Sequence, residues 1–266
     1  MMSFLFWNLN KKPLQDRVAQ LVGTHDVDVV MLAECAIDMS EVIDALNAAG
    51  VGGYHSTSGQ AGVVHVLSRM SPDSIVDHYD TVGGRMSIKR VAAPRFEFLL
   101  AIAHLPSRVN AGVESLNGLL TQVSKEIDTA EDTAGHRRTI LVGDLNMNPF
   151  DSGMIGAFGL HGVMTRDLAR RQYRKVQTIP RPFFYNPMWG CFGDRTEGPA
   201  GTFYRGASEA VNPFWNMYDQ VLLRPGLMNH LDCLKILVSD GYDPLISNRG
   251  LPKASDHLPL FFRLDV

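Results

Sequence analysis

The chain has 266 residues, a mass of 29.4 kDa and 45% hydrophobic side chains, which is enough for a full hydrophobic core. A disordered or fibrous protein is therefore excluded. The 25 basic and 28 acidic side chains give a formal charge of −3, far from the strongly basic balance of a protein that coats nucleic acid. A polyanionic ligand would have to be bound by a local group of basic residues.

The apolar runs are too short for a membrane span. The longest, such as residues 29–33 and 98–103, fall well below the roughly 20 residues that a membrane-spanning helix needs. The first residues have no cationic stretch and do not fit a secretory signal. We therefore expect a cytoplasmic protein with no membrane contact. Cys35, Cys191 and Cys233 have no C-x-x-C spacing and are predicted to be free thiols.

Apolar stretches of strand length alternate with helical patterns along the chain. The expected strands cover residues 4–9, 27–33, 63–68, 96–104, 138–145, 219–223, 235–238 and 258–264. The expected helices cover residues 13–22, with Pro13 at the first helical position, 40–49 and 113–127. This order predicts layered α/β architecture but is too rich in strands for a simple doubly wound sheet. Two sheets with helices outside fit better.

The region from about residue 165 to 215 differs from the rest, because it is rich in Pro, Gly, Arg and aromatic residues and is predicted to form long loops. A loop segment of this size in a compact domain is usually functional. Residues 166–181 hold six basic side chains and one acidic one, a local charge of +5 that leaves −8 on the other residues. This basic segment either forms a solvated surface or binds phosphates next to a scissile bond. The aromatic residues after it either pack against the sheet or stack on bases.

Several predicted strands carry polar residues at their ends, where a core strand has no structural need for them. These residues are Asn8, Glu34, His104, Asp144, Asn146, Asp219, Asp256 and His257. A single polar residue of this kind is commonly a turn residue or a cap. Because the ends of strands in a sheet converge, the whole set is better explained as one site.

The residue types suggest chemistry at a phosphate. Oxygen ligands such as those of Asn8, Glu34 and Asp256 suit Mg²⁺ or Mn²⁺ better than zinc. Two histidines and further carboxylates allow acid, base and orienting roles. A phosphodiester bond is a plausible substrate, because a metal ion and cationic imidazoles stabilise charge in its transition state.

Six short motifs carry a resemblance to a known family. They are W-N-L-N at 7–10, L-A-E at 32–34, A-H-L-P-S at 103–107, G-D-L-N at 143–146, Y-D-Q-V at 218–221 and S-D-H at 255–257. Their order is similar to that of the endonuclease/exonuclease/phosphatase superfamily over residues 4–264. The resemblance implies a deoxyribonuclease I-like, four-layer α/β sandwich, with two packed mixed β-sheets flanked by helices. Because motifs near both ends of the chain would contribute residues to one site, we also expect a single domain over 1–266, with the loop-rich insertion at 165–215.

The resemblance also implies a metal site. Glu34 would ligate Mg²⁺ or Mn²⁺, with Asn8 and Asp256 beside it. Arg85 is either a phosphate contact or a solvated arginine on a strand edge.

The remaining motif residues would carry catalysis. His257 would act as general base or polarise the attacking water, and Asp219 would hold its other ring nitrogen. His104 would donate to the phosphate and help to stabilise the leaving oxygen. Asp144 and Asn146 would position or activate the water and brace the phosphate. Whether Asp144 or His257 takes the proton stays open.

The motif around His104 resembles pancreatic-type deoxyribonucleases, deadenylases, sphingomyelinases and inositol polyphosphate phosphatases more than abasic-site repair enzymes. We therefore expect a metal-dependent nuclease whose substrate is nucleic acid, with DNA favoured, and no obligate protein partner. The alternatives are a phosphomonoesterase or a phospholipid or inositol phosphate hydrolase of the same fold, and, from another class, a non-catalytic binding domain.

Overall fold

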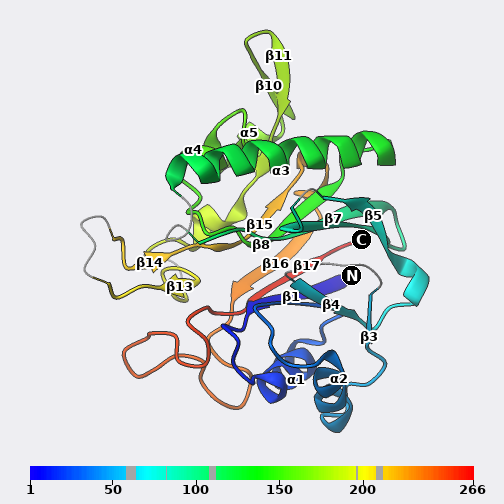
Figure 1. The fold of residues 1–266 in the computed structure, drawn as a ribbon, viewed down its shortest axis with the longest axis vertical. Coiled ribbons are helices and arrows are strands. Elements are labelled where there is room, and N and C mark those ends of the chain that lie inside the picture. The colour runs from blue at the N-terminus through cyan, green and yellow to red at the C-terminus, as the bar shows by residue number, and fades with distance from the viewer. Residues whose placement is uncertain (58–63, 82, 108–111, 196, 208–211) are drawn as a thin grey trace.

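The protein is described by a computed structural model that covers residues 1–57, 64–81, 83–107, 112–195, 197–207 and 212–266. Two β-sheets pack face to face, with α1 and α2 outside one sheet and α3 outside the other, so the expected four-layer α/β sandwich is confirmed (Figure 1). The helices are α1 (Gln15–His25), α2 (Met39–Ala48), α3 (Val113–Ala134), α4 (Ser152–Ile155) and α5 (Arg166–Ala169). Within the described ranges, none of them is long and apolar enough to cross a membrane.

Both large sheets are mixed. Sheet A has the spatial order β16 (Leu231–Ile236), β17 (Leu260–Leu264), β1 (Met2–Asn8), β2 (Val29–Ala33), β4 (Val64–Ser68) and β3 (His55–Ser56). Sheet B has the order β5 (Ile75–Asp80), β6 (Met86–Ala92), β7 (Glu97–His104), β8 (Thr139–Asp144), β15 (Asp219–Leu223), β12 (Phe184–Tyr185) and β9 (Gly162–Val163). The pairs β1/β2, β7/β8 and β9/β12 are parallel, and the other pairs are antiparallel.

Alternation along the central strands explains the layers. In β1, Phe4 and Phe6 point into the core between the sheets, whereas Leu5 and Trp7 pack in the layer that α1 and α2 cover. All seven residues of β1 are buried, as expected for a strand covered on both faces. The Phe4 ring stacks on Phe262 of β17 at 4.6 Å between ring centroids.

Most expected elements exist, with shifted boundaries. The first helix begins at Gln15 rather than at Pro13, and the strand expected at 235–238 is displaced to Leu231–Ile236. The helix expected at 113–127 extends to Ala134 and ends at Gly135, whose φ of +73° suits glycine. Val63, expected to begin a strand, lies outside the described residues.

The expectation of long loops at 165–215 is wrong in part. This segment contains α5 and two small antiparallel pairs, β10 (Tyr173–Val176) with β11 (Ile179–Pro182), and β13 (Phe203–Tyr204) with β14 (Trp215–Asn216). Edge strand β5 and its neighbour β6 were also not expected, because charged residues such as Asp77 and Lys89 break their apolar pattern. The three cysteines are free, as expected.

Candidate active site

Adjacent strand ends bring the predicted polar residues together. Asn8 ends β1 beside Ala33 of the parallel strand β2, and Glu34 follows directly. In sheet B, Asp144 ends β8 between two register partners, His104 of the parallel β7 and Asp219 of the antiparallel β15. Because the sheets pack face to face, these ends form one polar edge of the sandwich.

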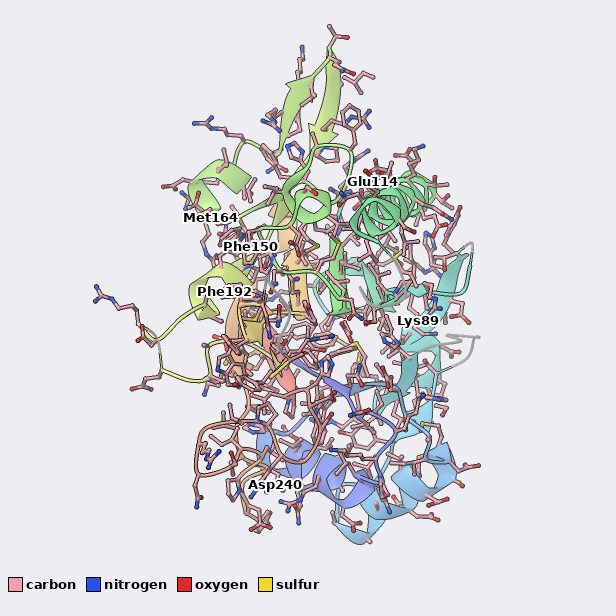
Figure 2. The ribbon with its side chains drawn as sticks, turned by 60° about the vertical axis from the view of Figure 1, so that its left-hand side comes forward. Lys89, Glu114, Phe150, Met164, Phe192 and Asp240 are labelled. Atoms are coloured by element: carbon pink, nitrogen blue, oxygen red, sulfur yellow. The ribbon has the colours of Figure 1, made fainter. Side chains whose placement is uncertain are left out.

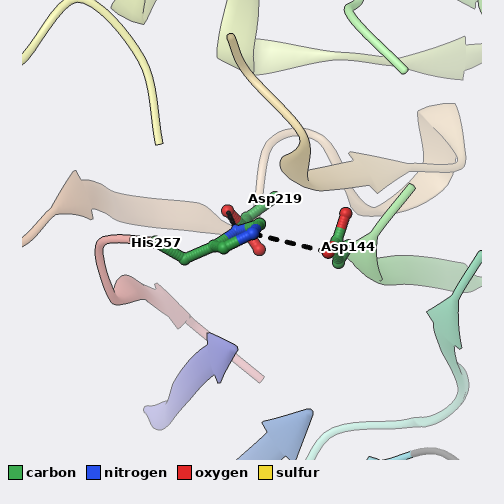
Figure 3. Close-up of side chains that lie close together, drawn as sticks. All are labelled: Asp144, Asp219 and His257. Atoms are coloured by element: carbon green, nitrogen blue, oxygen red, sulfur yellow. Dashed lines mark hydrogen bonds and ion pairs between the residues drawn. The ribbon is translucent and has the colours of Figure 1, made fainter. Parts of the chain in front are cut away.

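Asp144, Asp219 and His257 form a compact group at this edge, in which the His257 imidazole contacts both carboxylates (Figure 3). His257 Nδ1 lies 2.8 Å from Asp219 Oδ2, and His257 Nε2 lies 3.8 Å from Asp144 Oδ2. All three side chains are buried. The short contact means that Nδ1 carries the proton and donates it to Asp219, which leaves Nε2 facing Asp144.

Burial and neighbouring charges shift the pKa values of this trio. Burial alone would lower the pKa of His257, but the carboxylates of Asp219 and Asp144 outweigh it and raise that pKa to about 9. Burial, reinforced by Asp219, raises the pKa of the Asp144 carboxyl against the attraction of His257 and His104. A charged imidazole between two carboxylates thus makes their close approach tolerable.

Asn8, Glu34 and His104 extend the site towards sheet A. Asn8 Nδ2 donates to Asp144 Oδ2 at 3.0 Å and to Glu34 Oε1 at 3.5 Å. His104 Nε2 lies 3.5 Å from the same Glu34 oxygen and 3.8 Å from Asp144 Oδ2. The Asn8 side-chain oxygen Oδ1 accepts the Asn10 N–H at 3.0 Å, which fixes the side-chain amide with its nitrogen towards the carboxylates.

Two site residues have left-handed backbone conformations. Glu34 has φ +44° and Asn146 has φ +50°, values that are uncommon for residues with a Cβ and that recur at functional sites. Asn146 is held there because its N–H donates to Asp144 Oδ1 at 2.9 Å and its side-chain nitrogen donates to the Leu105 carbonyl at 2.9 Å. The strand ends therefore turn sharply and direct these side chains along the edge.

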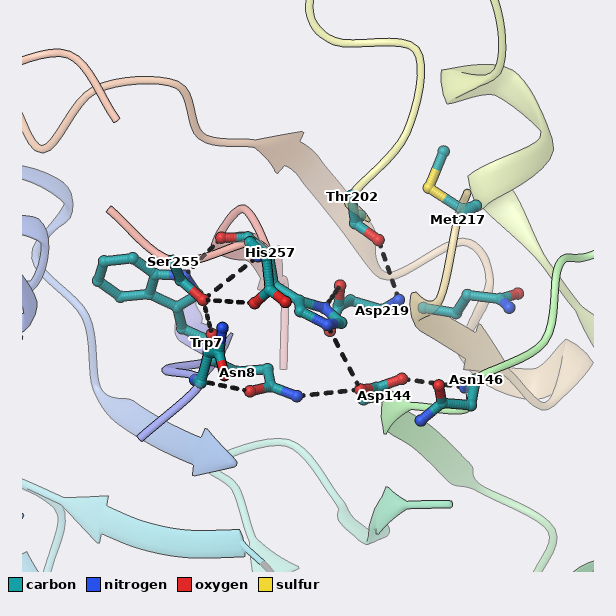
Figure 4. Close-up of polar contacts among 12 residues, drawn as sticks. Trp7, Asn8, Asp144, Asn146, Thr202, Met217, Asp219, Ser255 and His257 are labelled. Atoms are coloured by element: carbon teal, nitrogen blue, oxygen red, sulfur yellow. Dashed lines mark hydrogen bonds and ion pairs between the residues drawn. The ribbon is translucent and has the colours of Figure 1, made fainter. Parts of the chain in front are cut away.

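Supporting residues to which the sequence assigned no role brace the trio (Figure 4). The Ser255 hydroxyl donates to the Asn8 carbonyl at 2.8 Å, and Trp7 Nε1 donates to the His257 carbonyl at 3.0 Å, so the two ends of the chain are tied at the site. The Asp219 N–H donates to Thr202 Oγ1 at 3.0 Å. Ser255 lies in a recognised motif, but nothing in the local sequence marks Thr202.

The remaining residues that the sequence singled out are Asp256, Arg85 and the basic segment 166–181, and each lies in a different part of the structure. Asp256 is half-buried, and its Oδ1 lies 3.3 Å from the Ser255 hydroxyl, which ties it to the Asn8 strand end. Arg85 is exposed, and its backbone carbonyl accepts the His104 N–H at 3.0 Å. The basic segment 166–181 is rooted at the far end of sheet B, because β12, which follows it, pairs with Leu223, four residues along β15 from Asp219.

A family model described as the Endonuclease/Exonuclease/phosphatase family matches residues 5–257. The chain belongs to the endonuclease/exonuclease/phosphatase family. No curated protein matches the sequence. The family match agrees with the resemblance that the motifs carry.

Solved structures share this fold at low sequence identity. An AP endonuclease from Archaeoglobus fulgidus has a TM-score of 0.60 at 15% identity and covers 100% of both chains. TDP2 from D. rerio, complexed with single strand DNA product, has a TM-score of 0.58 at 17% identity, covering 100% of this chain and 99% of the other. The 3′ phosphatase NExo (D146N) from Neisseria, bound to product DNA hairpin, has a TM-score of 0.55 at 16% identity and covers 100% of both chains. The fold is thus that of a phosphoesterase family with both nuclease and phosphatase members.

The site of this family member fits a divalent metal ion. The buried Asp219 Oδ1 has no hydrogen-bond partner among the described residues, although a buried carboxylate oxygen normally has one. Ligand atoms of Asp144, Asp219 and His257 lie within 4.8 Å of one another. Glu34 and Asp144 both direct an oxygen at Asn8 Nδ2. Hard oxygen donors grouped in this way are suited to a divalent cation.

Proposed function

We propose that this chain is a divalent-metal-dependent phosphodiesterase that cleaves nucleic acid, with DNA the favoured substrate. The observation that carries the proposal is the buried group of Asp219, His257 and Asp144 beside Glu34 and His104. It combines hard oxygen ligands, an oriented imidazole and hydrogen-bond donors within one edge of the sandwich. Hydrolysis of a phosphate diester needs these three elements.

Glu34 would hold Mg²⁺ or Mn²⁺, with Asn8 and Asp256 beside it. Asp144 and Asp219 add carboxylate oxygens next to this position. A bound divalent ion would supply Lewis-acid stabilisation of negative charge on a phosphoryl oxygen. The Glu34 and Asp144 carboxylates, which both contact Asn8, would then bind the ion instead of repelling each other.

His257 and Asp144 share the proton chemistry. Asp219 accepts the Nδ1–H of His257, so the imidazole cannot rotate and its Nε2 remains directed at Asp144. One member of this pair takes the proton of the attacking water, and the other stabilises the resulting charge. Asp219 therefore has an orienting role.

Donors around the same point would bind the phosphate. His104 Nε2 lies between Glu34 and Asp144 and would donate to a phosphoryl or leaving oxygen. The Asn146 side chain braces the turn after β8 through the Leu105 carbonyl. His104 ends β7 and Asn146 lies in the turn directly after β8, and these strands keep their positions precise.

Two observations support nucleic acid as the substrate. The structural neighbours named above include an AP endonuclease and proteins bound to DNA products. The chain also carries a basic segment, residues 166–181, of the kind that binds a phosphate backbone. We further propose that residues 1–266 act as one catalytic unit, because residues from Asn8 to His257 contribute to one site.

The experiment is an incubation of purified protein with single- and double-stranded DNA, RNA and a panel of soluble phosphate esters, each with Mg²⁺, Mn²⁺ or EDTA. The proposal predicts metal-dependent shortening of an oligonucleotide. Free phosphate from monoesters, with intact oligonucleotides, would instead identify a phosphatase. Binding of DNA without turnover under every condition would identify a non-catalytic domain.

A further inference from the structure

A separate β-hairpin projects from the molecule next to α5. Strands β10 and β11 pair only with each other among the described strands, and in Figure 1 they extend beyond α3, outside both large sheets. We call residues 170–182 the basic hairpin. They include five basic side chains, Arg170, Arg171, Arg174, Lys175 and Arg181, and no acidic one.

The basic hairpin is held firmly at its base by His161. The Arg174 Nε–H donates to His161 Nε2 at 3.1 Å, so His161 Nδ1 carries the proton and donates to the Arg181 carbonyl at 3.2 Å. Burial, helped by the charge of Arg174, lowers the pKa of this histidine and keeps it neutral. Because Arg174 and Arg181 are also cross-strand partners, one buried imidazole joins both strands to the body of the protein.

Other charges of the basic hairpin are presented to solvent. Arg171 and Lys175 are exposed, and among the described residues neither side chain has an ion pair. Arg170 pairs with Asp167, the one acid of the basic segment. Tyr173 beside them is 48% exposed. A rigid element that carries unpaired positive charge and an exposed aromatic ring is suited to a polyanion.

The backbone of the basic hairpin is poorly suited to a partner strand. Pro180 and Pro182 lie in β11 and lack the N–H that a strand added at this edge would need. Proline in an edge strand prevents edge-to-edge pairing. Recognition by charge is therefore favoured over recognition by strand addition.

The hairpin stands apart from the active site. Its base meets Arg224 at the end of β15 opposite Asp219, where Arg224 Nη1 donates to the Phe183 carbonyl at 3.3 Å. The strand from Asp219 to Leu223 spans about 13 Å, and β10 extends about another 10 Å outwards. A nucleic-acid strand advances about 3.4 Å per nucleotide, so the gap corresponds to roughly four to seven nucleotides.

We propose that the basic hairpin is a second nucleic-acid contact that binds backbone phosphates roughly four to seven nucleotides from the bond that is cleaved. This inference rests on the proposed function for the identity of the substrate. It assigns to residues 170–182 a role in affinity for long substrates and none in the chemical step.

The test compares wild type with the variant Arg171→Gln/Lys175→Gln. These positions are chosen because their side chains are exposed, whereas Arg174 supports the structure through His161. A control, Arg90→Gln/Arg95→Gln, removes two exposed charges at the opposite end of sheet B, where they pair with Glu97 and Asp265. Equal melting temperatures would establish that all three proteins are folded.

Binding is measured in EDTA with labelled DNA and RNA of about 30 nucleotides, single- and double-stranded, over a range of salt concentrations. For duplex DNA, loss of two phosphate contacts should flatten the slope of log K against log salt by about 1.8, and weaken affinity about tenfold at low salt. In turnover assays KM for the long substrate should rise with kcat unchanged, and cleavage of a tetranucleotide should be unaffected. The control should match wild type.

Unchanged affinity and salt slope in the hairpin variant would overturn the inference, as would an equal loss in the control. So would hairpin-dependent binding to phosphatidylserine-containing vesicles with nucleic-acid binding unaltered. If wild type cleaves no nucleic acid yet binds it through the hairpin, the proposed function fails and the binding surface stands. If wild type cleaves nucleic acid and the hairpin variant behaves like wild type, the proposed function stands and the inference about the hairpin fails.

Discussion

Asp144 and Asp219 are direct register partners at the adjoining ends of β8 and β15, two buried carboxylates that the fold holds side by side. His257 joins them, with Nδ1 at 2.8 Å from Asp219 and Nε2 at 3.8 Å from Asp144. Asp219 therefore acts on the reaction through the imidazole. This dependence leads to a specific pattern of mutant activities.

Asp219→Asn should lower kcat about 10- to 100-fold, because the imidazole loses the partner that fixes its proton and orientation. His257→Ala should lower kcat about 1,000-fold, within the range typical of a general acid or base. The double variant should be no slower than His257→Ala alone, since Asp219 acts through His257. Steady-state kinetics on one oligonucleotide would measure all three. Multiplicative losses would mean that the two residues act independently.

Glu34→Gln should reduce kcat/KM by about 100-fold or more while leaving the melting temperature in EDTA nearly unchanged, because Glu34 is a half-buried residue at a strand end. It should also abolish the rise in melting temperature that Mg²⁺ or Mn²⁺ gives wild type, since a ligand that binds only the folded state stabilises it. Glu41→Gln, an exposed position on α2, is the matched control. A variant that unfolds but retains specific activity would refute the metal-binding role.

Gly143→Ala should destabilise the protein by about 3 kcal/mol or more. Gly143 precedes Asp144 at φ +149°, and an added Cβ would lie 1.8 Å from the Ala103 carbonyl oxygen of β7. Gly118→Ala on the exposed face of α3 meets nothing within 4 Å and should stabilise by about 0.5–1 kcal/mol. Urea denaturation of both variants tests the contrast. Equal effects would mean that β7 and β8 separate more easily than their pairing implies.

Asp240→Asn should destabilise the protein by about 1–2 kcal/mol at pH 7 and by much less at pH 3. Burial would raise the pKa of this carboxyl, but the N–H groups of Asp243 and Tyr242 and the Arg17 guanidinium outweigh it and lower the pKa. A carboxyl with a lowered folded pKa stabilises above its unfolded pKa of about 3.9, and this stabilisation is lost as pH falls through the folded value. Urea unfolding at both pH values provides the measurement. A difference between the proteins that does not change with pH would contradict this assignment.

The sequence predicts the interior of this fold better than its periphery. Strands such as β1 and β8 are buried on both faces, so they appear as continuous apolar runs. Strand β6 contains Lys89, which pairs at 2.7 Å with Asp77 of the edge strand β5, and such a cross-strand pair cannot be recognised from one sequence. The turn of the basic hairpin uses Gln177 and Thr178 with positive φ, instead of the Asn-Gly that usually marks it.

The candidate site, too, was predictable from the sequence only in part. Polar residues at strand ends were sufficient to predict that Asn8, Glu34, His104 and Asp144 would meet, because strand ends converge. The position of Asp219 against Asp144 depends on the pairing of β15 with β8, across 75 residues of sequence. Supporting contacts such as that of Thr202 depend on tertiary packing and carry no local signal. The distance of the basic segment from the site could likewise come only from sheet order.

The most direct test of the account is cleavage of a labelled DNA oligonucleotide by wild type and His257→Ala, each with Mg²⁺, Mn²⁺ or EDTA. The account predicts shortened products with wild type and a divalent ion, none in EDTA, and about 1,000-fold slower cleavage by the variant at an unchanged melting temperature. Wild-type cleavage that persists in EDTA, or that His257→Ala leaves intact, would contradict it.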